Sequence, residues 1–226
     1  MKLTWLGHSG FRMEIAGETL LVDPWLRGNP MFDETRFDEA VEGAGWVLVS
    51  HGHGDHAGDA AEIAKKTGAK LVGIYDFMQW MEGEHGIETV GFNKGGTVAL
   101  GEVNVTMVQA THSSSFPGLN YAGTESGFMI EGEGKTIYFS GDTDVMADMQ
   151  VFQALHAPEI GILCAGGHFT MDMKRAAYAA KTFFDFETVI PCHYRTFPLL
   201  AQNAEAMRAE LGDKVREPEV MAPIEL

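Results

Sequence analysis

The sequence HGHGDH places four potential metal ligands in a short loop, directly after a WVLVS run typical of a buried strand. These side chains are His51, His53, Asp55 and His56, and the intervening glycines free the backbone for the tight path that convergence requires. Residues two apart in an extended loop can point to one side, so His51 and His53 can share one ion. The adjacent Asp55 and His56 more naturally serve a second ion. Histidine and carboxylate suit divalent metals such as zinc, although a solvated polar loop or a helix cap would explain the same residues.

Two neighbouring dications repel strongly, so such a centre needs further ligands and a bridging anion. Three later segments offer them, each just after an expected strand: His112 in ATHSSS, Asp142 in SGDT and His193 in PCHYRTFP. Taken singly, each has a milder explanation, because buried histidines form hydrogen bonds and aspartates form turns. Three such residues at strand ends, beside the HGHGDH loop, favour the metal-site interpretation.

Four other polar residues near these motifs are candidates for contact with a substrate. His8 in LGHSG could hydrogen-bond a substrate at the rim of a pocket or transfer a proton, and a turn histidine is the alternative. Ser113 directly follows a ligand candidate, so its hydroxyl could contact substrate or satisfy loop backbone groups. Arg195 could hold an anionic group with its forked donors, or lie on the surface. His168 in GGHFTMD, at the expected start of a long helix, could approach the pocket or hydrogen-bond at that helix end.

Alternating strands and helices must position these residues. Apolar or alternating runs predict strands at 3–6, 11–15, 20–23, 46–50, 71–74, 97–100, 103–109, 127–131, 136–140, 160–164 and 188–191. Helices are expected at 59–67, 77–85, 146–155, 173–184 and 201–211. Sheets with helices following in both halves indicate a layered α/β domain, in which helices cover two packed sheets. No linker or repeat divides the chain, so residues 1–226 are expected to form one domain.

The composition narrows the classes of partner. Of the 226 residues, 16 are Lys or Arg and 32 are Asp or Glu, which gives a net charge of −16. This acidity disfavours binding to nucleic acids and to anionic membrane surfaces. The two cysteines cannot form a disulfide framework, and the N-terminus lacks the apolar core of a signal peptide. We therefore expect a cytoplasmic protein with neither a nucleic acid nor a membrane as partner.

The motifs also resemble those of a known superfamily. Asp23 in LLVDPW, the HGHGDH loop, and the later His112, Asp142 and His193 follow, in order, the five motifs of the metallo-β-lactamase superfamily. The strings GHS, THSS, SGDT, GGHFTMD and PCHY are similar to one branch, the UPF0173 metal-dependent hydrolases, which are related to the L-ascorbate-6-phosphate lactonases. The resemblance covers nearly the whole chain.

This resemblance implies an αββα four-layer sandwich with two metal ions at one edge, between the sheets. It assigns His51, His53 and His112 to one ion, and Asp55, His56 and His193 to the other. Asp142 would bridge the ions, and Asp23 would support the histidine loop by hydrogen bonds, although Asp23 could equally end its strand in a turn. Oxygen-reducing diiron relatives carry Glu where this chain has His53, so hydrolysis is the expected chemistry.

The expected function is that of a dinuclear metal-dependent hydrolase, in which a metal-activated hydroxide cleaves a small ester, lactone or phosphoester. Asp55 would orient the nucleophile, and His8 or a metal-bound water would protonate the leaving group. Zinc is the expected metal, with Mn, Fe or Ni as alternatives. The ions would make the pocket locally cationic, so a small anionic substrate is acceptable, and related lactonases suggest a homo-oligomer. The alternatives are a nuclease or phosphodiesterase of the same superfamily and a non-enzymatic metal-binding protein.

Overall fold

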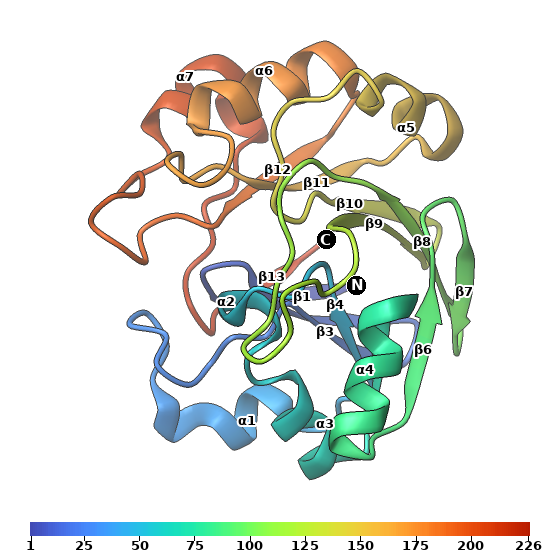
Figure 1. The fold of residues 1–226 in the computed structure, drawn as a ribbon. Coiled ribbons are helices and arrows are strands. Elements are labelled where there is room, and N and C mark those ends of the chain that lie inside the picture. Colours follow the sequence, from blue (N-terminus) through green and yellow to red (C-terminus); the bar gives the residue numbers. More distant parts are fainter.

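Two mixed β-sheets lie face to face in the computed structural model, which describes residues 1–226, and helices cover their outer faces (Figure 1). In spatial order, the first sheet consists of β13 (Pro223–Glu225), β1 (Lys2–Gly7), β2 (Gly10–Ile15), β3 (Glu18–Val22), β4 (Trp46–Val49), β5 (Lys70–Ile74) and β6 (Thr89–Phe92). The second consists of β12 (Thr188–Cys192), β11 (Ile160–Cys164), β10 (Lys135–Phe139), β9 (Ser126–Gly132), β8 (Val103–Gln109) and β7 (Thr97–Leu100). The expected αββα sandwich is confirmed.

Helices from the N-terminal part of the chain cover the first sheet, and helices from the C-terminal part cover the second (Figure 1). The first sheet is covered by α1 (Phe37–Val41), α3 (Ala60–Thr67) and α4 (Tyr75–His85), and the second by α5 (Met149–His156), α6 (Met173–Phe183) and α7 (Glu205–Leu211). One more short helix, α2 (Gly54–Ala57), follows β4. In α6 the buried residues are mostly alanines, so that helix can pack closely against the second sheet.

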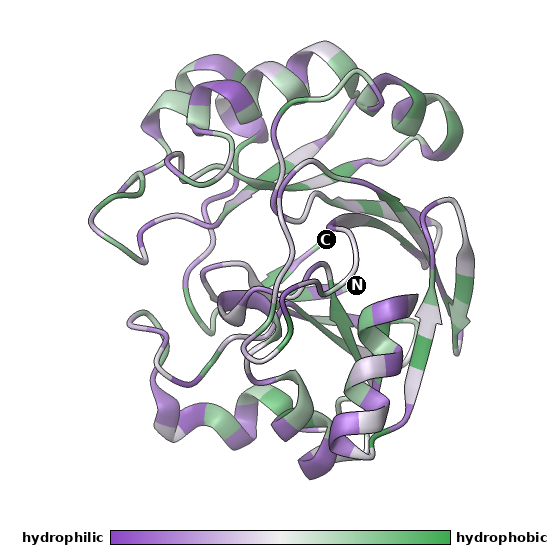
Figure 2. Ribbon diagram, in the orientation of Figure 1, coloured by the Kyte–Doolittle hydropathy of each residue, from purple (hydrophilic) through white to green (hydrophobic).

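The burial pattern of the strands explains the layering. The central strands β4 (WVLV) and β11 (IGILC) read as continuous apolar runs, as expected for strands covered on both faces. In β2, by contrast, Arg12 and Glu14 alternate with buried apolar residues. Figure 2 shows the hydrophobic colour concentrated on the strands between the helical layers, whereas hydrophilic segments gather on the outer helices. The buried apolar side chains form one contiguous cluster of 65 residues.

Several elements differ from the sequence prediction. Strands β6 and β13 were not expected, because β6 is short and half-buried, and β13 begins with a proline at the sheet edge. Helices α5 and α7 begin later than expected, since turns precede them. Helix α6 begins at Met173, where the Asp172 side chain accepts a hydrogen bond from the Arg175 N–H. The prediction that His168 lies at the start of this helix is therefore wrong, and His168 belongs to the preceding loop.

The polar motifs follow six strands that end at one edge of the sandwich. Strands β1, β3 and β4 run in one direction within the first sheet, as do β8, β10 and β12 within the second. Each is followed by one of the candidate motifs, so their carboxyl ends bring together residues far apart in sequence. None of the helices is both long and apolar enough to cross a membrane.

Candidate metal centre

The HGHGDH loop after β4 turns its four ligand-type side chains toward the gap between the sheets. His51 and His56 are buried, whereas His53 and Asp55 are partly exposed. His51 Nε2 lies 3.0 Å from His53 Nδ1, so this pair already faces one point. His53 stands at the N-cap of α2 without a capping side-chain hydrogen bond, so capping does not explain these residues.

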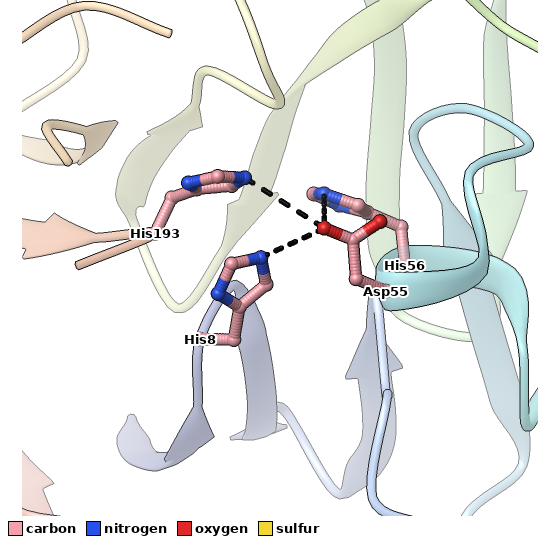
Figure 3. Close-up of side chains that lie close together, drawn as sticks. All are labelled: His8, Asp55, His56 and His193. Atoms are coloured by element: carbon pink, nitrogen blue, oxygen red, sulfur yellow. Dashed lines mark hydrogen bonds and ion pairs between the residues drawn. The ribbon is translucent and has the colours of Figure 1, made fainter. Parts of the chain in front are cut away.

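Potential ligand atoms lie within 4.8 Å of one another in three groups, one of which joins Asp23 to His51 and His56, and the other two contain the candidate ligands of the two ions. The first of these two groups consists of His51, His53 and His112. The second consists of His8, Asp55, His56 and His193, and Figure 3 shows its imidazoles directed toward the Asp55 carboxylate. The structure thus brings together all the residues that the resemblance assigns to each ion, and adds His8 to the second group.

Asp142 lies between the two groups. Its Oδ2 atom is 3.1 Å from His193 Nε2, 3.3 Å from His56 Nε2 and 3.6 Å from His112 Nε2. One carboxylate oxygen therefore faces ligands of both groups, which is the position that a bridging ligand requires. Burial opposes charge on Asp142, but His193 and His56 lower its pKa well below the usual range, so the carboxylate is ionised.

The donor atoms fit divalent cations. His56 Nε2 and Asp142 Oδ1 are buried and have no hydrogen-bond partner in the protein. Unpaired buried polar atoms are costly, and a cation among imidazoles and carboxylates would satisfy them. Burial lowers the pKa of His51 well below its usual range and also lowers that of His53. These imidazoles are therefore neutral at neutral pH, which is the form that binds metal.

Asp23 holds the HGHGDH loop in place by hydrogen bonds. Its Oδ1 accepts a hydrogen bond from the Ser50 N–H at 2.7 Å, and its Oδ2 lies 2.7 Å from His56 Nδ1. The Ser50 hydroxyl, 3.0 Å from His51 Nδ1, also donates to Asp23. A carboxylate on the second nitrogen of a ligating histidine sets its tautomer and ring orientation. This geometry matches the supporting role that the resemblance implies for Asp23.

Comparison with known proteins agrees with the fold and the ligand cluster. A model of the β-lactamase superfamily domain matches residues 2–193. UPF0173 metal-dependent hydrolases from Dinoroseobacter shibae and Paracoccus denitrificans are each 64% identical over 230 residues, covering 100% of this chain and 100% of the relative. The chain belongs to the UPF0173 family of metal-dependent hydrolases. The resemblance inferred from the motifs is confirmed, and so is the expectation that the protein is a metal-dependent hydrolase.

Solved structures support the same assignment for this UPF0173 hydrolase. Igni18, a metallo hydrolase from Ignicoccus hospitalis, superposes with a TM-score of 0.88 at 34% identity, covering 100% of this chain and 98% of Igni18. The metallo-β-lactamase fold protein YhfI from Bacillus subtilis gives a TM-score of 0.76 at 16% identity, covering 100% of this chain and 98% of YhfI. The likeness to YhfI extends to the fold alone.

His8 lies deeper in the hydrolase than expected. Its side chain is 0% exposed, so the prediction that it stands at the rim of the pocket is wrong. Its Nε2 lies 3.1 Å from Asp55 Oδ2, and its Nδ1 lies 2.8 Å from the Thr196 hydroxyl. Burial lowers the pKa of His8 to about 4, although the Asp55 hydrogen bond acts in the opposite direction. His8 thus contacts Asp55 and does not line the cavity, so we expect it to position Asp55 and not to touch the substrate.

The backbone around His8 is held in an unusual conformation. His8, Asp23 and His193 all adopt positive φ angles, of 52°, 45° and 55°. Such angles are unfavourable for residues with a side chain and persist only where surrounding contacts enforce them. Here the His193 N–H donates to the His8 carbonyl at 2.9 Å, and a Cβ at Gly166 would lie only 1.9 Å from the His193 carbonyl oxygen. The strand ends are thus locked together across the two sheets.

A cavity of about 340 Å³ opens onto these ligands. It is lined by His53, Asp55, His112, Ser113, Asp142, Phe169, His193 and Phe197. The predicted Ser113 is therefore at the cavity wall, with its hydroxyl 3.5 Å from His53 Nε2. The two phenylalanines were missed by sequence reasoning, because an aromatic residue in a loop carries no periodic signal.

Two of the predicted substrate-binding residues do not line the cavity of the hydrolase. His168 is exposed, with a φ of 58°, and only its neighbour Phe169 reaches the wall. Arg195 is also exposed, and its guanidinium carbon lies 5.9 Å from the ring centroid of Trp5 and 5.9 Å from that of Tyr194. The backbone is left-handed at both positions, with φ angles of 58° and 68°. Thr196, which sequence reasoning also missed, points inward to His8 instead.

Proposed function

We propose that the chain is a dinuclear hydrolase that cleaves a small ester, lactone or phosphoester. The observation that carries this proposal is the position of Asp142 Oδ2 within 3.6 Å of donor atoms from both ligand groups. One ion would be held by His51, His53 and His112, and the other by Asp55, His56 and His193, with Asp142 shared between them. Zinc is the metal that this histidine-rich set favours, with Mn, Fe and Ni as alternatives.

Bound divalent ions would supply two kinds of chemistry, because they lower the pKa of water from 15.7 to about 7 and polarise the oxygen of the scissile group. The protein's own residues prepare the site for both. Asp55 lines the cavity with one carboxylate oxygen fixed by His8, so its direction toward an entering water is set. Ser113 offers a hydroxyl at the wall that can hydrogen-bond the substrate. Burial of His51, His56, Asp142 and His193 keeps bulk water from these candidate ligands.

Metal removal tests the proposal directly. The purified protein is treated with a chelator, reloaded with Zn²⁺ or Mn²⁺, and assayed with generic ester, lactone and phosphodiester substrates, while metal content is measured by elemental analysis. We expect two ions per chain in the loaded protein and hydrolysis that disappears with the metal and returns on reloading. Equal activity in the stripped and reloaded forms would overturn the proposal.

A matched pair of variants tests the bridging role. Asp142→Asn should reduce the metal content below two ions per chain, because the amide cannot bridge two cations as a carboxylate does. Asp148→Asn, a control in the loop before α5, lies outside both ligand groups and should leave two ions bound. An Asp142→Asn protein with two ions and unchanged activity would show that Asp142 does not bridge.

A further inference from the structure

Two phenylalanines stand out in the otherwise polar cavity. Phe169, from the loop between β11 and α6, is 50% exposed, and Phe197, from the loop after β12, is half-buried. Large apolar side chains are normally covered, and an exposed one at the wall of a ligand cavity is a typical contact for an apolar group. The two residues come from separate loops and both line the same space.

Backbone hydrogen bonds of the loop keep Phe169 exposed. The Phe169 N–H donates to the Gly167 carbonyl at 2.6 Å, and the Gly167 N–H donates to the Met171 carbonyl at 2.9 Å. The loop is tied to the ligand-bearing edge as well, since the Met171 N–H donates to the Thr143 carbonyl at 3.1 Å, next to Asp142. A left-handed conformation at His168 completes the turn. The backbone therefore holds Phe169 at the cavity mouth instead of letting it fold onto the core.

Phe197 is fixed by aromatic neighbours. Its ring centroid lies 6.0 Å from that of Trp25 and 5.7 Å from that of His8, which it meets edge to face. These distances are typical of aromatic pairs, which restrict the ring orientation. The ring thus forms a rigid apolar wall close to the residues of the second ligand group.

Charge in the cavity argues against recognition of an anionic tail. No lysine or arginine lines it, and Arg195, the cation nearest in sequence to His193, packs near Trp5 and Tyr194 instead. The two carboxylates that line it, Asp55 and Asp142, are the ones assigned to the ions, and the chain as a whole has a net charge of −16. A carboxylate or phosphate on the substrate, remote from the bond that is cleaved, would find no charged partner here.

We propose that the substrate is neutral apart from its reacting group and carries an apolar substituent that packs against Phe169 and Phe197. This inference rests on the proposed function, because the ions fix the reacting group and so decide where the substituent lies. It narrows the small-molecule class suggested by the sequence, in which an anionic substrate was also acceptable.

Hydroxamates test this inference without any turnover, because their two oxygens chelate the metal while the substituent probes the wall. Binding of acetohydroxamate, phenylacetohydroxamate and succinic monohydroxamate to the Zn²⁺-loaded protein is measured by calorimetry. We expect the phenyl compound to bind at least about tenfold more tightly than the methyl compound, since apolar pocket contacts give discrimination of this order. The carboxylate compound should bind no better than the methyl compound.

Substitutions of the two phenylalanines test whether these side chains cause the preference for the phenyl compound. Phe169→Ala and Phe197→Ala should each reduce the phenyl-to-methyl preference while two ions remain bound. Leu155→Ala removes a comparably exposed apolar side chain on α5, outside the cavity, and should preserve the preference. A preference that survives in both phenylalanine variants would overturn the assignment of the apolar wall.

The outcomes separate this inference from the proposed function. Suppose that the metal-loaded protein binds all three hydroxamates equally, binds none of them, or prefers the carboxylate compound. Each of these results would contradict the proposed apolar contact with Phe169 and Phe197 without contradicting the proposed metal centre. A protein that binds no metal after reloading overturns the proposed function, and with it this inference.

Discussion

The two ends of the sandwich join the sheets in opposite ways. At one end the sheets meet through buried polar side chains, including His56, Asp142 and His193, which are 0%, 2% and 1% exposed. At the other end the exposed Glu133, in the turn between β9 and β10, accepts hydrogen bonds from the Ala16 N–H and the N-terminal ammonium, both at 2.6 Å. The two donors adjoin strands of the first sheet, whereas Glu133 connects two strands of the second sheet.

The difference shows what each end is built for. Exposed ion pairs contribute little to stability but leave no group unpaired, because water solvates whatever the protein does not. Buried imidazoles and carboxylates are costly unless their polar atoms are hydrogen-bonded. Asp142 Oδ1 has no hydrogen-bond partner in the protein, and His56 Nε2 lies 3.3 Å from Asp142 Oδ2 without making a hydrogen bond. Stability alone would favour apolar residues at that end. Its composition is therefore explained by cation binding, and removing single residues from the two ends should have very different consequences.

His193→Ala should produce the largest effect. His193 is the candidate ligand that the second sheet contributes to the second group, and its Nε2 lies 3.1 Å from Asp142 Oδ2. We expect the second ion to be lost or weakened, the first to be affected much less, and hydrolysis to fall at least about a hundredfold. Elemental analysis beside the melting temperature checks this. His156→Ala, at the end of α5 and outside both groups, is the control. Two full ions in His193→Ala would remove this residue from the ligand set.

Asp23→Asn should produce the next largest effect. The amide keeps the shape of the carboxylate, but its single oxygen cannot accept from both the Ser50 N–H and His56 Nδ1, so the histidine loop loses its orientation. Loss of such an outer partner typically costs ten- to a hundredfold in metal affinity, and an unpaired buried donor costs about 1–3 kcal/mol of unfolding free energy. Competition titration with a zinc indicator and chemical denaturation measure the two effects. Asp38→Asn, an exposed control, should change neither, and wild-type zinc affinity in Asp23→Asn would refute the supporting role.

The sequence predicts the candidate ligand positions because each follows a strand whose apolar pattern can be recognised. HGHGDH after WVLVS and the single residues His112, Asp142 and His193 are all of this kind. Strand direction then brings the candidate ligands to one edge, since parallel strands within a sheet end at the same edge. The αββα layering could be predicted for the same reason, together with the family resemblance.

The cavity wall and the far end could not be predicted in this way. Phe169, Phe197 and Thr196 lie in loops where side-chain direction depends on single φ angles and on contacts with distant segments. Motif adjacency pointed to His168 and Arg195 instead, but neither residue lines the cavity, and both have left-handed backbone, with φ angles of 58° and 68°. Short elements such as β13 depend on pairing with a strand from the other end of the chain, which no local pattern encodes.

His8→Ala should have an intermediate effect that differs in kind from that of His193→Ala. His8 contacts Asp55 and not the cavity, so its loss should misorient the carboxylate while both ions stay bound. We expect kcat to fall about tenfold, the lower end of the range for outer partners, with a smaller change in KM and two ions per chain. Thr196→Val, which removes the hydroxyl beside His8 Nδ1, should shift kcat in the same direction by less. Loss of an ion in His8→Ala would make His8 a ligand instead of a positioning residue.

Glu133→Gln should have the smallest effect, and its pH dependence identifies the cause. The hydrogen bond from the N-terminal ammonium, followed by that from Ala16 N–H, lowers the pKa of Glu133 below its ordinary value of 4.5. Between the lowered value and 4.5 the unfolded chain binds more protons than the folded chain, so the contribution of this pair is complete above about pH 4.5 and is lost as the pH falls further. The melting temperatures of wild type and Glu133→Gln should therefore differ slightly at pH 6 and converge in acid, and added salt should also reduce the difference. Metal content and hydrolysis should stay at wild-type values, because the far end holds no ligand. A loss of metal in Glu133→Gln would mean that the two ends are coupled through the sheets, and that the contrast between them is not one of function.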